Sequence, residues 1–99
     1  MQNKQKQNND YQIIPLDDWS NYFYTTDFDL SVTLLCKNYI LETIDAESSG
    51  KATFVFQNDK NIVSDVDNYW QDRVMVSPLN FATVRKNLKS RIYGMRKQF

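Results

Sequence analysis

The fold is decided by the carboxy-terminal segment SPLNFATVRKNLKSRIYGMRKQF, residues 77–99. Ser77 followed by Pro78 is typical of a helix start, because serine caps the free backbone amides and proline at the first helical position leaves no N–H unpaired. Beyond this start, large apolar side chains recur and, at 100° per residue, lie within about 40° on either side of Leu88. They are Phe81, Val84, Leu88, Ile92, Met95 and Phe99. The pattern predicts a long amphipathic helix that ends at about residue 96 and buries its Leu88 side.

The region just before this segment predicts a second helix and a short connection. Asp59 is placed to cap a helix whose apolar residues recur at helical spacing: Ile62, Val66 and either Tyr69 or Trp70. The run Val74-Met75-Val76 is short enough to be either an edge strand or a linker.

The first half of the chain predicts three strands. Residues 21–25 are aromatic, a second strand begins at Ile40, and a third spans 51–57 with Phe54 and Phe56 on one face. Residues 47–50, Glu-Ser-Ser-Gly, form a turn cluster between the last two strands.

A further helix is expected between the first two strands. Thr26 with Asp29 three residues later is a weak capping-box pattern, and Asn38 suits the left-handed residue that closes a helix. The apolar residues between them lie at spacings of four, three and four: Phe28, Val32, Leu35 and Tyr39.

The elements together predict an α+β domain. The order β-α-β-β-α-(β)-α gives a small three- to four-stranded sheet with helices packed on one face and a long carboxy-terminal amphipathic helix. Residues 1–10 are polar and predict a disordered tail, so residues 11–99 form a single domain.

Composition excludes several kinds of chemistry. The chain has no histidine, two glycines and one cysteine, Cys36, which removes the usual general base, a glycine-rich phosphate loop and an internal disulfide. No pair of carboxylates stands in an apolar setting that would separate their pKa values. We therefore expect a cytoplasmic, non-enzymatic protein with no cofactor, no metal and no membrane association.

Charge is unevenly distributed although the net charge is zero. Residues 10–75 carry all twelve acidic residues, whereas residues 76–99 carry six cations and no acid. On the helical wheel, five of these cations share one broad face with a tyrosine among them. The resulting set is Arg85, Lys86, Lys89, Tyr93, Arg96 and Lys97.

Such a face is typical of a nucleic-acid contact, with cations for phosphates and a ring for stacking, so DNA or RNA is the first expected partner. Five contacts to duplex phosphates would give a slope of about −4.5 in log affinity against log salt. The alternative is a solvated face, or one that is paired with acids inside the fold.

An RNA-recognition-type sheet fits the residues poorly. The phenylalanine face of strand 51–57 is the one apolar enough for the core, so its other face presents Thr53 and Gln57, which stack no base. Residues 11–20 predict an extended arm that lies on the domain, and Tyr22 and Tyr24 either form an open aromatic face or pack under this arm.

Four strings together resemble a known family: FYTTDFDLSVTLLCKNY (23–39), TFVF (53–56), YW (69–70) and NLKSRIY (87–93). It is a small domain of unknown function found in bacteria, archaea and their phages or other mobile elements. The resemblance covers about residues 20–95 and brings no catalytic residue with it. It implies a phage or mobile-element context.

A protein-interaction module is the second hypothesis, either an inhibitor of a host protein or a self-assembling protein. The acidic body and the basic helix are complementary between chains as well as within one. Aromatic residues of the kind that anchor interfaces are Trp19, Tyr22, Tyr24 and Trp70.

Overall fold

The computed structural model describes residues 21–46 and 51–96, which form an α+β fold. The elements are β1 (Tyr22–Thr25), α1 (Phe28–Cys36), β2 (Leu41–Asp45), β3 (Thr53–Gln57), α2 (Ile62–Trp70) and α3 (Pro78–Arg96). The predicted fold class is confirmed. The predicted tail and arm before residue 21, the turn 47–50 and residues 97–99 lie outside the described residues.

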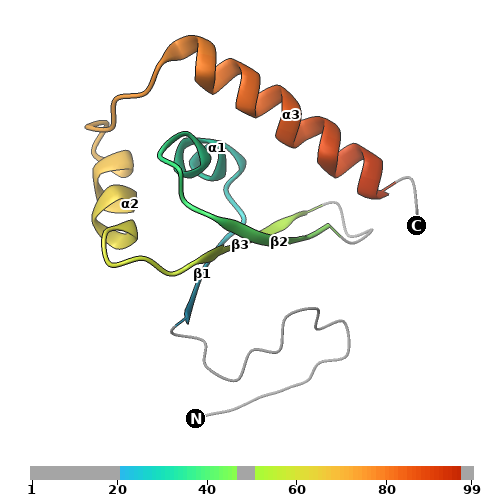
Figure 1. The fold of residues 1–99 in the computed structure, drawn as a ribbon, viewed down its shortest axis with the longest axis horizontal. Coiled ribbons are helices and arrows are strands. Elements are labelled where there is room, and N and C mark those ends of the chain that lie inside the picture. Colours follow the sequence, from blue (N-terminus) through green and yellow to red (C-terminus); the bar gives the residue numbers. More distant parts are fainter. Residues whose placement is uncertain (1–20, 47–50, 97–99) are drawn as a thin grey trace.

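The sheet has three strands in the order β1-β3-β2, and both pairings are antiparallel. Phe54 and Phe56 of the central strand are buried, as their shared face predicted. Figure 1 shows α1 and α3 on one side of this sheet, with α2 standing beside α1. The core therefore lies between the phenylalanine face of β3 and the helices.

Helix α1 is held at both ends by local sequence, although the predicted cap residue is wrong. Asp27, not Thr26, is the N-cap: its Oδ1 accepts from the Leu30 amide at 2.8 Å. The Thr25 hydroxyl accepts from the Asp27 amide, which fixes the cap. At the other end Asn38 has a φ of 70°, as expected for the residue that closes the helix.

The N-cap of helix α2 is Asn61 and not Asp59, so the predicted cap is wrong. Asp59 Oδ1 accepts from the Asn61 amide in the preceding turn, and Asn61 is the N-cap without a side-chain bond. Val66 and Tyr69 pack on the core, whereas Trp70 is exposed.

The segment Val74-Met75-Val76 is a linker and not a strand. The reason is the way α2 ends. Asp72 has a φ of 60°, and the amides of Asp72 and Arg73 bond back to α2 carbonyls, which turns the chain toward α3. The sheet formed by the described residues therefore stays three-stranded.

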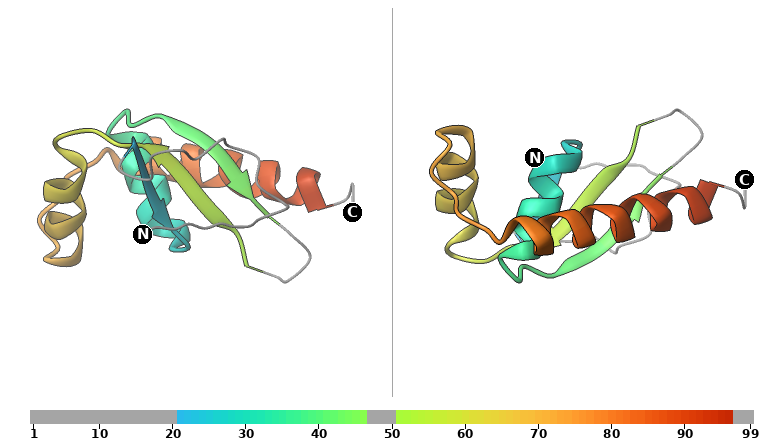
Figure 2. Two further views of the ribbon diagram at one scale, coloured as in Figure 1. Left: turned by 90° about the horizontal axis from the view of Figure 1, so that it is seen from below. Right: turned by 90° about the horizontal axis from the view of Figure 1, so that it is seen from above.

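Helix α3 starts as its sequence predicts, because the Asn80 amide donates to the Ser77 hydroxyl. Leu88 and Ile92 are buried in the core, and Phe81, Val84 and Met95 pack around them. Figure 2 shows α3 running across α1 and on toward the β2–β3 end of the sheet. One flank of α3 therefore faces the sheet and α1, while its outer face is open to solvent.

Candidate functional site

A cleft of about 270 Å³ lies along one flank of α3. Its other walls come from the start of α1 and the start of β3, so three separate elements enclose it. The described lining residues are Thr26, Phe28, Lys51, Ala52, Phe54, Arg85, Lys89, Ile92, Tyr93 and Arg96.

The lining is strongly basic. It includes four cations and, among the described residues, no carboxylate. Arg85, Lys89 and Arg96 are four and seven residues apart on α3, which places them on one side of the helix. Lys51 joins them from the segment just before β3. We name these four side chains and the walls around them the basic cleft.

Among the four cations, Arg85 is fixed by contacts with α1. Its Nε lies 3.1 Å from Asp29 Oδ1, and its guanidinium carbon lies 5.2 Å from the centroid of the Phe28 ring. Both charged side chains are about half exposed, so the ion pair contributes about 0–1 kcal/mol. Arg85 therefore positions α3 on α1, with part of its charge offset.

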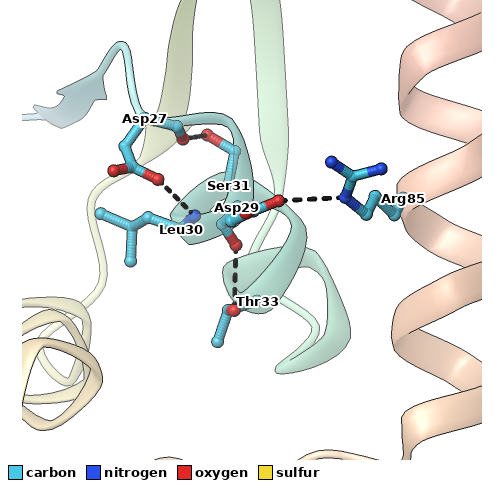
Figure 3. A network of polar contacts seen from close by, with 6 residues as sticks. All are labelled: Asp27, Asp29, Leu30, Ser31, Thr33 and Arg85. Carbon is cyan, nitrogen blue, oxygen red and sulfur yellow. Dashed lines mark hydrogen bonds and ion pairs between the residues drawn. The ribbon is translucent and has the colours of Figure 1, made fainter. Parts of the chain in front are cut away.

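Asp29 is held in place by the first turn of α1. Figure 3 shows the Arg85 side chain extending from α3 to Asp29 in the first turn of α1. Asp27 caps this α1 helix. The hydroxyls of Ser31 and Thr33 donate to the carbonyls of Asp27 and Asp29, which satisfies two buried polar groups. Asp29, the acidic partner of the ion pair, therefore lies in a first turn of α1 that is held by several hydrogen bonds.

The other three cations of the basic cleft differ from Arg85 in having no described ion pair. Within residues 21–46 and 51–96, no carboxylate lies within ion-pair distance of Lys51, Lys89 or Arg96. The Arg96 Nε is also buried, and it finds no hydrogen-bond acceptor in this part of the chain. Cations without a carboxylate in ion-pair distance favour binding of an anionic group.

An aromatic ring and an apolar floor complete the basic cleft. Tyr93 is 55% exposed and belongs to the lining, between Lys89 and Arg96 in the sequence. Ala52, Phe54 and Ile92 are buried and close the cleft from below. The cleft can therefore take a ligand that has both a flat apolar part and negative charge.

Four of the six residues expected to bind nucleic acid line the basic cleft: Arg85, Lys89, Tyr93 and Arg96. Lys86 is exposed but is not among the lining residues, and Lys97 lies outside the described residues. Sequence reasoning missed Lys51, Thr26 and Phe28. Lys51 carried a usable signal, since it lies just before the strand whose phenylalanine face packs against the helices.

The four aromatic residues expected at an interface have different surroundings. Tyr22 and Tyr24 are half-buried on β1, with ring centroids 6.4 Å apart in an edge-to-face arrangement. Trp70 is 62% exposed and contacts Tyr69 edge-on. Trp19 lies outside the described residues.

A second cleft, of about 340 Å³, adjoins Trp70. Its described lining residues are Thr33, Tyr69, Trp70, Asp72, Val74 and Val76. Exposed Met75 and Leu79 extend the apolar surface along the linker and onto the first turn of α3. We name this area the Trp70 surface.

Potential metal ligands and the single thiol are the remaining reactive groups in the described part of the chain. Its His, Cys, Asp and Glu residues form no group of three that could hold a metal ion. Burial raises the pKa of the Cys36 thiol, which keeps it protonated and weakly nucleophilic. The described helices include none that is long and apolar enough to cross a membrane.

Fold and site define a small α+β domain with a basic, aromatic-lined cleft beside its last helix. The chain belongs to the family DUF5659, a domain of unknown function, whose profile matches residues 20–94. This agrees with the resemblance over residues 20–95. The searches of curated proteins and of solved structures gave no match.

Proposed function

We propose that this chain is a small accessory nucleic-acid-binding protein, acting in the phage or mobile-element context that the family resemblance implies. It binds without catalysis and contacts phosphates with the cations of the basic cleft. The observation that carries the proposal is the convergence of Lys51, which precedes β3, with Lys89 and Arg96 of α3, and none of the three has a described carboxylate in ion-pair distance. Unpaired cations beside an exposed ring are the groups that bind phosphates and bases.

Charge reversal tests this proposal. The double variant Lys89→Glu/Arg96→Glu should abolish binding in a filter-binding titration at low salt, because it replaces two phosphate contacts with repulsion. Neither residue belongs to the hydrophobic core, so the melting temperature should change by no more than a few degrees.

A matched control separates local from overall charge. Lys60→Glu/Arg73→Glu makes the same change in net charge at two exposed residues outside the basic cleft, and it should bind almost as the parent does. The proposal fails if the parent retains neither DNA nor RNA at low salt. It also fails if the control loses as much affinity as the cleft variant.

The Trp70 surface favours a second candidate function, self-assembly. Trp70, Met75 and Leu79 are 62%, 88% and 77% exposed, and the acidic Asp67 and Asp72 flank Trp70 in sequence. The complementary charge is carried by α3, so a second copy of this chain is the occupant that these features fit.

Light scattering at increasing salt tests self-assembly. Assembly held by the acidic and basic surfaces should dissociate as salt screens them, and Trp70→Ala should weaken it at every salt concentration. A monomer at all salt concentrations would rule this candidate out.

A further inference from the structure

We infer that the basic cleft is built for single-stranded nucleic acid, with one base stacked on Tyr93 and the neighbouring phosphates held by Lys89, Arg96 and Lys51. This inference rests on the proposed function and names its ligand class. It is argued from the position of the cations, the exposed ring and the shape of the cleft.

The position of the cations argues against a duplex. A helix that reads duplex DNA enters the major groove with its protruding face. The cations of the basic cleft instead lie on the flank of α3 that is walled by α1 and β3. We expect these two walls to hinder a duplex, whose groove must close around the helix that reads it. A single strand can lie along the flank.

The position of Tyr93 on α3 suits a base that does not stack on neighbouring bases and can instead stack on the tyrosine ring. At a rise of about 1.5 Å per residue, Tyr93 lies about 6 Å along α3 from Lys89 and about 4.5 Å from Arg96. A base on the ring therefore has a cation on each side for its flanking phosphates. Bases in a duplex are stacked on each other and cannot offer a face to a side chain, whereas single-stranded bases can.

The size of the cleft agrees with one nucleotide at a time. Its volume of about 270 Å³ is just below the range of about 300–1,000 Å³ that holds larger ligands. The apolar floor suits the base, and Arg96, a partly exposed residue of the lining, brings a cation for a phosphate oxygen.

Fluorescence anisotropy with labelled probes tests the inference on the full-length chain. The probes are an oligothymidylate, an oligouridylate and a mixed-sequence duplex of the same length. We expect at least tenfold tighter binding of one of the single strands than of the duplex. With three phosphates contacted, log affinity for that strand should fall with log salt at a slope of about −2.1.

Substitutions of Tyr93 separate stacking from charge. Tyr93→Leu should weaken single-strand binding by about five- to 150-fold, the loss expected for one base–ring contact, whereas Tyr93→Phe should bind like the parent. Both variants should retain the parent's melting temperature, because Tyr93 is half exposed.

The outcomes distinguish the two proposals. Duplex binding as tight as that of both single strands, or full single-strand affinity in Tyr93→Leu, would overturn the inference and leave the proposed function standing. Absence of binding to all three probes at low salt would overturn both.

Discussion

Replacing Leu88 with alanine tests whether α3 is part of the core or only an appended basic helix. Leu88 is 3% exposed and belongs to the buried cluster that includes Phe54 and Phe56. The substitution removes three carbon groups at about 0.8 kcal/mol each, or about 2.4 kcal/mol of transfer free energy. Incomplete collapse of the resulting cavity raises the loss in unfolding free energy to about 3–5 kcal/mol.

Leu79 provides a matched control on the same helix. It is 77% exposed, so Leu79→Ala changes the helix propensity by the same amount but removes almost no burial. Its unfolding free energy should stay within about 0.5 kcal/mol of the parent. The difference between the two variants therefore measures the burial of Leu88 alone.

Urea denaturation followed by circular dichroism gives the unfolding free energies, and thermal melts check them. In a domain of this size each 1 kcal/mol corresponds to about 4–8 °C, so Leu88→Ala should lower the melting temperature by at least about 12 °C. Equal losses in Leu88→Ala and Leu79→Ala would refute the placement of α3 against the sheet.

Three further predictions concern local features of the fold. Asp27→Ala should lower the unfolding free energy by about 1 kcal/mol in a urea titration, because the α1 cap is lost, and Asp27→Asn should retain most of it. Asp72→Gly should raise the urea midpoint, since glycine accepts a φ of 60° without strain, while Asp72→Val should lower it. Burial, with the hydrogen bond to Asp65, raises the pKa of Tyr39 above its usual value of about 10. The stability from the protonated phenol is thus complete below pH 10 and is lost above it, so Tyr39→Phe should show a shallower fall in melting temperature between about pH 10 and 11.

The helices were predictable because their signals are local. Ser77-Pro78 and Asn38 act within one turn of the chain, and both act as their residue types predict. Asp27 was missed in favour of Thr26 because adjacent polar residues both qualify as caps, and the choice depends on which side chain reaches the Leu30 amide. The strand order β1-β3-β2 depends on the pairing of β1 with β3, two strands far apart in the sequence, and no local pattern contains that pairing.

The basic cleft was predictable only on its α3 side. A helical wheel places Arg85, Lys89 and Arg96 together because their relative angles follow from one axis. It cannot show which strand end lies opposite that flank, and therefore Lys51 was missed. The Arg85–Asp29 pair joins residues 56 positions apart, so it too depends on how α3 packs on α1.

The basic charge of α3 serves either to neutralise the acidic part of the fold or to bind an anionic partner. The described ion pairs bear on this choice. If α3 were basic in order to neutralise the acidic body, its cations would pair with carboxylates of α1 and α2. In the described part of the chain one of them does, Arg85 with Asp29, and that pair is half exposed. The Nε of Arg96, which is buried, finds no acceptor in that part of the chain. Within the described residues internal pairing thus accounts for the anchoring of α3, and the proposed function assigns Lys51, Lys89 and Arg96 to an anionic ligand.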